Sequence, residues 1–437
     1  MIRRLAYLVA ISLILFSGCS LKRNSNLLYN FKASLDSLKI LHVSAILELK
    51  CNKDSSCMKL NLKNYANNIK IFDKNNVSIN YIHTSDTLIV LLKSIKGITQ
   101  LKIDYELPVD SFKVDSVFYL ARSAKWIPFV YDNIYDLSMD ITLPKKYAAY
   151  SSCFIDSVSD NNKTTYKFHN VNNTSFPLII APSNFYTQTS KTISGYKFDY
   201  FFYSKDSVCK RMIIDESIRA FFYCNSKIGK EEIKQKTFIE CPEIQYVQSH
   251  RGFITIGTDF IKNYRLPEYK FWPSHEMIHQ WIGSGIEIPL KNGDNDFTCE
   301  SFTEFIRFLY MKDMFGSDSL DYQLRYNLAL YDQFVKGTKS DVAINKYVNN
   351  GDAVDLFYNN APIFLYYLFV NSDEKKIRNM IKSIYSSYYN KYFTLSDFHK
   401  ILSENVKDKK LMSKFDYFLD NKGISKDVRD LIPQKKK

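Results

Sequence analysis

The chain has 437 residues, of which 46% are hydrophobic and 15% aromatic, and its formal net charge is +13. This composition excludes an intrinsically disordered chain, and the length suffices for two or three domains with cores of their own. The basic residues are dispersed apart from a short run at 435–437. Because no nucleic-acid-binding module signature accompanies them, the excess charge does not indicate a nucleic-acid partner.

The first residues have the features of an export signal. Two arginines precede an apolar run at 5–16, which is too short to span a bilayer, and small residues then lead to Cys19. This pattern is similar to a bacterial lipoprotein signal, although an ordinary signal peptide is the alternative. We expect residues 1–18 to be a signal peptide, Cys19 to be lipidated and residues 19–29 to be a tether. The rest of the protein would then be an extracytoplasmic, membrane-anchored lipoprotein.

Seven cysteines remain after Cys19 among the eight in the sequence. Cys51 and Cys57 enclose a short polar segment, which we interpret as a loop between two strands that a disulfide could close in an oxidising compartment. The other cysteines are too scattered to be paired from sequence, and none of them forms a cluster with zinc-finger spacing.

Residues 30–190 are predicted to form strands. Apolar residues between 101 and 107 alternate with charged ones, as they do between 77 and 81, which is typical of a half-buried antiparallel sheet. A generic binding sandwich is one interpretation of this region. A polar stretch at 183–194 marks the expected boundary with a second domain at 191–437.

The second domain is predicted to begin with alternating element types. A strand is expected at 195–203, a helix at 206–225 and further strands at 236–241 and 253–256. These elements lead directly into the segment that carries the clearest chemical signal in the sequence.

That signal is His-Glu-x-x-His, formed by His275, Glu276 and His279. On a helix the two histidines lie one turn apart on one face, so both imidazoles can bind a single metal ion. Glu276 then lies beside the open coordination position, where it can act as a general base towards a metal-bound water.

A third ligand is available further along the chain. Catalytic zinc sites keep three protein ligands, and Glu300 opens a second apolar helical pattern after His279. We therefore expect one Zn²⁺ held by His275, His279 and Glu300. Glu304, one turn later, is a candidate acceptor for the second nitrogen of a ligand histidine, with a solvated carboxylate as the alternative. Cys299 is expected to be a buried neutral thiol rather than a metal thiolate.

These residues resemble the aminopeptidase N-like gluzincins, a family of zinc metallopeptidases. The family pattern is His-Glu-x-x-His-Gln-Trp-x-Gly, then a loop, then Asn-Glu-Gly-Phe-Ala. Here the first part runs from His275 to Gly283 and the second reads Cys299-Glu300-Ser301-Phe302-Thr303. The chain departs from the pattern at Cys299 and in a slightly longer connection, whose extra residues we place in a surface loop at 293–296.

The resemblance implies an α+β architecture. An N-terminal antiparallel β-saddle or sandwich would precede a thermolysin-like, mainly helical catalytic domain. It also implies zinc-promoted hydrolysis of a peptide or protein substrate, with Glu276 moving the proton. Tyr358 lies in a segment that resembles the family's Tyr-x-x-Gly-Ala, so it is expected to donate a hydrogen bond to the oxyanion.

One family motif has no counterpart. Aligning Gly252 and Phe253 with the residues that follow Gly-x-Met-Glu-Asn puts Ser249-His250 where the glutamate for the substrate's amino terminus should be. We expect Gly252 and Phe253 to lie beside the substrate, and Glu240 or Glu243 are candidates for the missing contact. Whether the enzyme is an exopeptidase or an endopeptidase stays open.

Two other functions also stay open. One is a lipoprotein that binds peptides without cleaving them, although a binding protein has no need of the base Glu276. The other is a zinc hydrolase that acts on a non-peptide amide. The remainder of the chain is predicted to be helical, and the expected helices lie at 362–370, 374–389, 395–406 and 411–419.

Overall fold

The computed structural model describes residues 27–121, 124–130, 134–242, 247–266, 269–289, 296–338, 341–346 and 356–432. The expected signal peptide and Cys19 lie outside these ranges, as do Glu243 and most of the 293–296 loop. Strand β1 begins at Leu27, so the last residues of the expected tether are part of the first strand.

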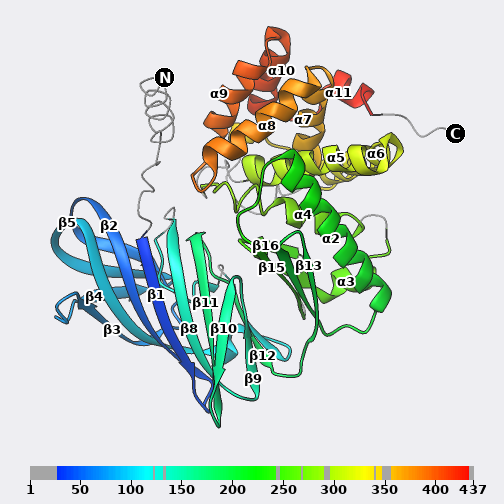
Figure 1. Ribbon diagram of the computed structural model, residues 1–437. Coiled ribbons are helices and arrows are strands. Elements are labelled where there is room, and N and C mark those ends of the chain that lie inside the picture. The colour runs from blue at the N-terminus through cyan, green and yellow to red at the C-terminus, as the bar shows by residue number, and fades with distance from the viewer. Residues whose placement is uncertain are drawn as a thin grey trace, which may run out of the picture.

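The N-terminal part is a β-sandwich of two layers (Figure 1). The larger layer is an eight-stranded sheet in the order β10-β11-β8-β1-β2-β5-β3, with β4 paired to β5. Its strands are β1 (Leu27–Leu35), β2 (Ile40–Asn61), β3 (Asn67–Asp73), β4 (Tyr81–Thr84), β5 (Thr87–Pro108), β8 (Tyr135–Pro144), β10 (Phe154–Ser159) and β11 (Lys163–Asn173). The smaller layer has the order β6-β7-β12-β9. It consists of β6 (Lys113–Val114), β7 (Val117–Leu120), β12 (Leu178–Pro182) and β9 (Tyr147–Tyr150).

The alternation seen in the sequence is the burial pattern of this sandwich. Leu101, Ile103, Tyr105 and Leu107 of β5 are all buried, and β8 alternates buried and half-buried residues along its whole length. Buried residues of both layers form one hydrophobic core. Most pairings are antiparallel, whereas β1 and β8 are parallel. The half-buried pattern expected at 101–107 is therefore confirmed, whereas the one expected at 77–81 is wrong, because Val77 and Tyr81 are exposed.

One local prediction is wrong in this region. The segment from Cys51 to Cys57 is not a loop between two strands, because β2 continues through it and pairs with β5, with register shifts near Ser55. Cys57 is an exposed free thiol. The polar stretch at 183–194 contains strand β13 (Thr187–Ile193), which forms a hairpin with β14.

The second part begins with a five-stranded mixed sheet in the order β13-β14-β15-β17-β16. β14 (Tyr196–Phe202), β15 (Gln235–Cys241) and β17 (Phe253–Gly257) are parallel, and β16 (Val247–His250) is an antiparallel edge strand. Helix α2 (Ser207–Lys227) begins with the side chain of Asp206 as its N-cap. It packs on the sheet through Phe221, whose ring contacts Phe198 of β14.

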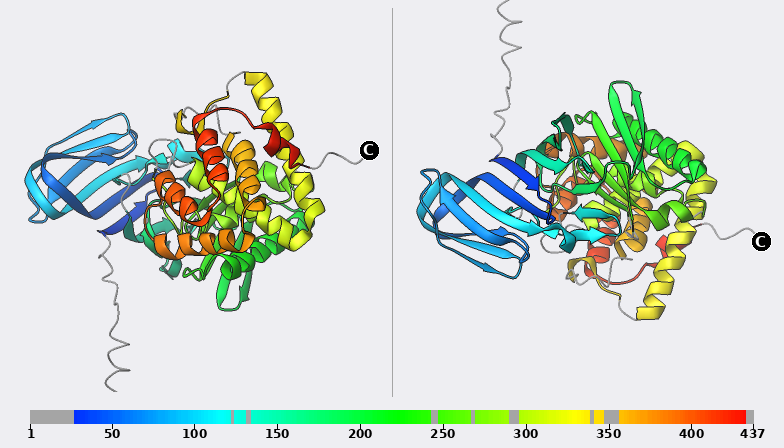
Figure 2. Two further views of the ribbon diagram at one scale, coloured as in Figure 1. Left: turned by 90° about the horizontal axis from the view of Figure 1, so that it is seen from above. Right: turned by 90° about the horizontal axis from the view of Figure 1, so that it is seen from below.

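Helices complete the molecule around this sheet (Figures 1 and 2). The two short helices α3 and α4 follow the sheet, and the remaining elements form the helical C-terminal half, joined to the sheet in one core. They are α3 (Thr258–Asn263), α4 (Trp272–Ile278), α5 (Phe302–Phe315), α6 (Ser317–Thr338), α7 (Ala361–Val370), α8 (Glu374–Tyr388), α9 (Leu395–Asn405), α10 (Lys409–Asp420) and α11 (Lys426–Asp430). The expected order, a β-sandwich and then a helical domain, is confirmed.

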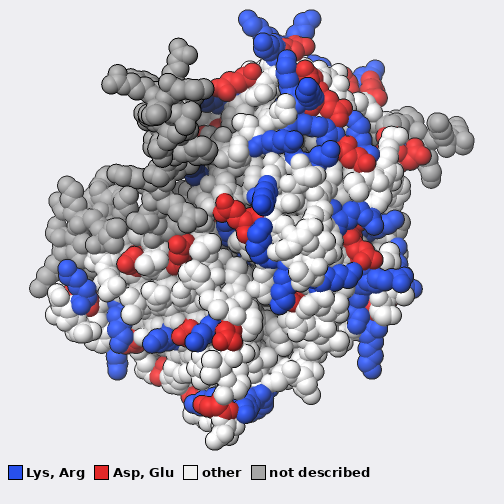
Figure 3. Space-filling view, viewed as in Figure 1, with Lys and Arg blue, Asp and Glu red and all other residues white. Residues whose placement is uncertain are grey.

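Two further features are the distribution of charged side chains on the surface and the hydropathy of the helices. On the face shown in Figure 3, lysine and arginine gather mainly over the helical half, with acidic residues between them. None of the helices in the described ranges is long and apolar enough to cross a membrane.

Candidate metal centre

Helix α4 presents the two histidines as the spacing predicts. Pro273 lies in its first turn, where a missing backbone N–H costs nothing, and His279 caps its C-terminus. The backbone N–H of His279 donates to the carbonyl of His275 at 3.2 Å, so one helical turn separates the two residues. Their Nε2 atoms lie 3.0 Å apart, and both side chains are buried.

Glu300 reaches these nitrogens from a different element. It lies on a π-helical turn, η4 (Asp296–Ser301), which leads into α5. Its Oε2 is 3.3 Å from Nε2 of His275 and 3.1 Å from Nε2 of His279. Among the described residues, these three form the one group of side chains close enough to hold a metal ion.

The donor set fits zinc. A tetrahedral ion with ligand distances of about 2.0–2.1 Å places its ligand atoms roughly 3.3 Å apart, which is close to the separations seen here. Two imidazole nitrogens and one carboxylate oxygen are also ligands that zinc commonly takes in hydrolases.

The outer nitrogens of the histidines are held by acceptors. Nδ1 of His275 lies 2.9 Å from Oε2 of Glu304, and Nδ1 of His279 lies 3.0 Å from the carbonyl oxygen of Ile282. Because these acceptors require a proton on Nδ1, the lone pair on each Nε2 is available for a metal.

Glu304 is itself fixed by Arg307. Burial alone would raise the pKa of Glu304, but the Arg307 guanidinium and the His275 imidazole hold it at about 2. Nε of Arg307 donates to Oε2 of Glu304 at 2.7 Å, and its NH2 group donates to Oε1. The carboxylate is therefore ionised and held in place.

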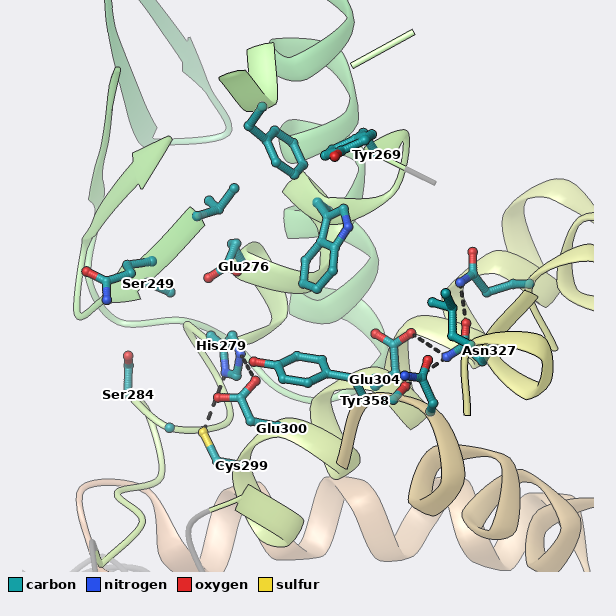
Figure 4. A pocket seen from close by; sticks show the side chains of 18 of the residues that line it. Ser249, Tyr269, Glu276, His279, Ser284, Cys299, Glu300, Glu304, Asn327 and Tyr358 are labelled. Carbon is teal, nitrogen blue, oxygen red and sulfur yellow. Dashed lines mark hydrogen bonds and ion pairs between the residues drawn. The ribbon is translucent and has the colours of Figure 1, made fainter. Parts of the chain in front are cut away.

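Glu276 lies on the same helix but apart from the three ligand atoms. Its side chain faces the cavity in Figure 4 and is only 5% exposed. Burial raises its pKa to about 8, the charge of Glu300 acts in the same direction and His279 opposes both. A divalent cation beside it would lower this pKa and favour the ionised form that a general base needs.

Tyr358 comes from a second π-helical turn, η6 (Leu356–Asn360). Figure 4 shows its hydroxyl pointing towards Glu300 and His279, and its ring lies 5.6 Å from that of His275. Burial, and then the charges of Glu300 and Glu276, raise the pKa of Tyr358 above its ordinary value. The phenol therefore keeps its proton and can donate a hydrogen bond.

A cavity of about 810 Å³ opens over these groups. Apart from the metal group and Glu276, its walls come from β16, α3, α4, α5, α6, the two π-helical turns and the segments between them. Residues that line them include Val247, Gln248, Ser249, His250, Phe260, Tyr269, Trp272, Gln323, Tyr326, Asn327, Leu330 and Asn359. The expected substrate contacts Gly252 and Phe253 are not part of this lining. Phe253 is fully buried in a small core between the sandwich and the second sheet, and β16 takes its place at the cavity.

The side chain of Gln280 holds β16 beside the cavity. Its Oε1 accepts from the backbone N–H of Gly252 at 2.8 Å, and its Nε2 donates to Oγ of Ser249 at 2.7 Å. The sandwich also contributes, because the hydroxyl of Tyr119 donates to Oε1 of Gln248 at 2.8 Å. Strand β16 is thus fixed to the residue that follows the C-cap of α4 on one side and to the N-terminal domain on the other.

Glu240 and Glu243 are the candidates for a contact with the amino terminus of a substrate. Glu240 is fully buried, accepts hydrogen bonds from the backbone N–H groups of Tyr203 and Ser204, and does not line the cavity. Glu243 lies outside the described residues. Cys299 is half-buried rather than fully buried and lines the cavity, with Sγ 3.7 Å from Nδ1 of His279, and desolvation raises its pKa well above the usual value. It is not part of the group of ligand atoms.

Comparisons with known proteins agree with this geometry at the level of the fold. Neither a protein-family model nor a curated protein matches the sequence. Among solved structures, a two-domain M1 zinc metallopeptidase variant bound to L-arginine has a TM-score of 0.72 and 11% identity, covering 92% of this chain and 94% of that one. The M1 zinc metallopeptidase from Deinococcus radiodurans has a TM-score of 0.68 with the same identity and coverage. A variant of the Deinococcus radiodurans protein bound to a Tyr-Ser-Ala substrate has a TM-score of 0.67, with 11% identity over 92% of this chain and 96% of that one. The chain therefore has the two-domain fold of the M1 zinc metallopeptidases over nearly its whole length.

Proposed function

We propose that this chain is a zinc-dependent peptidase. The observation that carries the proposal is the convergence of His275, His279 and Glu300 on one point, with the unliganded carboxylate of Glu276 beside it. A site that only bound peptides would not need a buried base next to an open metal position. The likeness in fold to M1 zinc metallopeptidases supports the same assignment.

His279 and Glu300 line the cavity, so an ion held by them and His275 would be accessible from it. A zinc ion bound there would supply a Lewis acid that activates water and polarises the scissile carbonyl. Glu276 takes the proton from the attacking water and later delivers it to the leaving amine. Tyr358 donates a hydrogen bond to the carbonyl oxygen as negative charge develops on it.

The substrate proposed for this site is a peptide in an extended conformation. The cavity is large enough for several residues, and β16 forms the edge of its sheet beside the centre. An edge strand offers backbone groups with which an extended peptide can pair. The solved structure bound to Tyr-Ser-Ala shows that this fold accepts a short peptide in a related protein.

Cleavage of two matched peptides tests both the activity and its mode. One peptide has a free amino terminus, the other is acetylated, and Glu276→Gln is the control. Cleavage of the free peptide alone by the zinc-loaded protein would establish an aminopeptidase, and cleavage of both would establish an endopeptidase. If neither peptide is cleaved faster than by the control with zinc bound, the peptidase proposal is wrong. Binding without cleavage, or hydrolysis of a non-peptide amide, would then replace it.

We also propose that the protein is anchored to a bacterial membrane through a lipid on Cys19. The support is the arginine-containing apolar segment that ends at this cysteine. Mass spectrometry of the N-terminal peptide from membranes should find Cys19 as the first residue, carrying acyl chains. Cys19→Ala should remove the lipid, and an N-terminus at another residue in the native protein would contradict the proposal.

A further inference from the structure

The turn that carries Tyr358 is held by two side chains that sequence reasoning did not identify. Oγ of Ser301 donates to the carbonyl of Phe357 at 2.8 Å, and Nδ2 of Asn327 donates to the carbonyl of Tyr358, also at 2.8 Å. Ser301 follows the ligand Glu300 directly, and Asn327 lies on α6. Both are almost completely buried.

The amide of Asn327 is oriented as well as buried. Nε2 of Gln323, one turn earlier on α6, donates to Oδ1 of Asn327 at 2.5 Å. This contact leaves Nδ2 as the group that faces η6, so the direction of the amide is set by its neighbours. Leaving a buried carbonyl without a hydrogen-bond donor costs free energy. The bond from Asn327 therefore restrains the backbone of Tyr358. Figure 4 shows Asn327 on the side of the cavity that faces Tyr358 and Glu304.

Asn327 also approaches Glu304, but this contact is weaker than its hydrogen bond to the Tyr358 carbonyl. The distance from Nδ2 to Oε1 of Glu304 is 3.4 Å, at the limit of a hydrogen bond. Arg307 already donates to both oxygens of Glu304. The carboxylate that supports His275 is therefore satisfied without Asn327, whereas the Tyr358 carbonyl receives its close side-chain bond from Asn327.

We propose that Asn327, assisted by Ser301, is a positioning residue that sets the distance between the Tyr358 hydroxyl and the metal centre. The inference rests on the proposed function, because it gives the position of Tyr358 a role in stabilising the oxyanion. An oxyanion donor must lie within a few tenths of an ångström of its productive position, and a displacement of about 1 Å can cost on the order of a hundredfold in rate.

A double-mutant cycle with Asn327→Leu and Tyr358→Phe tests this role. Leucine has nearly the shape of asparagine and lacks the donor. We expect Asn327→Leu to lower kcat roughly ten- to a hundredfold with little change in KM and in zinc affinity. In the Tyr358→Phe background the same substitution should cost less than about twofold, because the donor that it positions is already gone. An equal loss in both backgrounds, or a loss of zinc affinity, would overturn the proposal.

Asn61→Leu is a matched control for stability. Asn61 is a buried asparagine of the sandwich whose Nδ2 donates to the carbonyl of Phe129 at 3.3 Å, far along the chain from the metal residues. It should lower stability without lowering kcat in the remaining folded protein. If Asn327→Leu does not fold, Ser301→Ala removes the other bond to η6 and should show the same dependence on Tyr358.

Hydrogen exchange separates this inference from the proposed function, because it requires no activity. In the zinc-loaded protein, Asn327→Leu should speed exchange in a peptide covering residues 356–360 by about tenfold or more, with no change in the sandwich. Unchanged exchange there would contradict the positioning role even if the protein is a peptidase. Faster exchange without any peptidase activity in the wild type would show that the bond holds the turn and that the proposed function is wrong.

Discussion

Oε2 of Glu304 lies 2.9 Å from Nδ1 of His275, while Nε2 of the same ring faces the other ligand atoms. Nε of Arg307 donates to the same oxygen at 2.7 Å and fixes the carboxylate. The orientation of the first ligand is thus determined by a residue one helical turn after the third ligand. The hydrogen bond between Glu304 and His275 links α4, which carries the two histidines, to the helical segment that carries Glu300.

Glu304→Gln should therefore weaken zinc binding. The amide lacks the charge that favours the Nδ1 proton, and substitutions of such supporting groups typically lower metal affinity about 10- to 100-fold. The measurement is a competition titration with a chromogenic chelator. Glu374→Gln, at a half-exposed carboxylate on α8, is the control and should leave the affinity unchanged. Equal affinities for wild type and Glu304→Gln would contradict the supporting role.

Removal of the metal should destabilise the helical domain. A ligand present at 1,000 times its dissociation constant stabilises the folded state by about 4 kcal/mol. Addition of a chelator should lower the Tm of the wild type by several degrees, and excess zinc should restore it. His275→Ala should show neither response, because one of the three ligands is missing. A chelator-sensitive Tm in His275→Ala would indicate that the ion binds elsewhere.

Gly283→Ala should disturb the region behind the ligands. Gly283 has φ +96°, and a Cβ there would lie 2.8 Å from Sγ of Cys299. Gly316→Ala is a suitable control, because Gly316 has φ +83° and nothing within 4 Å of its added Cβ. Both variants should lose at least about 1 kcal/mol through backbone strain. Gly283→Ala should lose roughly 1–3 kcal/mol more through overpacking, and Cys299→Ala in the same chain should recover part of it. Denaturant unfolding with equal losses at both glycines would contradict the close contact.

The pH dependence of stability should reveal the buried carboxyl Glu216. It accepts a hydrogen bond from Tyr310 at 2.9 Å, and burial raises its pKa above the ordinary value, partly opposed by Tyr310 and Arg219. Because the folded-state pKa is the higher one, this group lowers stability as pH rises from the unfolded value of about 4.3 to the folded value. Below both values the effect is absent.

Glu216→Gln removes that ionisation and keeps an acceptor for Tyr310. Relative to the wild type, the variant should become progressively more stable as pH rises from about 4.3 to the folded-state pKa of Glu216. Urea unfolding at a series of pH values measures the difference. A difference that is independent of pH would show that Glu216 ionises with its ordinary pKa.

The grouping of His275, His279 and Glu300 could be predicted from the sequence because much of its geometry is local. His275 and His279 are one helical turn apart, and the helix alone determines which face they share. Glu300 required only that a second helical element follow the loop. Its place on a π-helical turn was not predictable, because an inserted residue in one turn leaves hardly any trace in apolar periodicity.

The supporting residues were only partly predictable. Glu304 follows from the same helical spacing. Asn327 and Ser301 were missed, because their partners are backbone carbonyls of a segment distant in sequence. A buried asparagine on a helix with many polar residues gives no signal that distinguishes it from a solvated one.

The strands that the sequence did not reveal have a related cause. Between Cys51 and Cys57 the side chains are polar, which is typical of a loop, but backbone pairing with β5 continues through the segment. Strand β13 was hidden for the same reason, since its residues are mostly exposed and do not alternate. Side-chain patterns report burial, whereas edge and hairpin strands are held by their backbone hydrogen bonds.

The most direct test of the account compares zinc content with peptide cleavage in the wild type and in Glu276→Gln. Both proteins should bind one zinc ion, because Glu276 is not a ligand. The wild type should cleave peptides at least about a hundredfold faster, because only it has the base. Zinc bound equally in both proteins, with no cleavage by the wild type or with equal cleavage by both, would contradict the proposed function of this site.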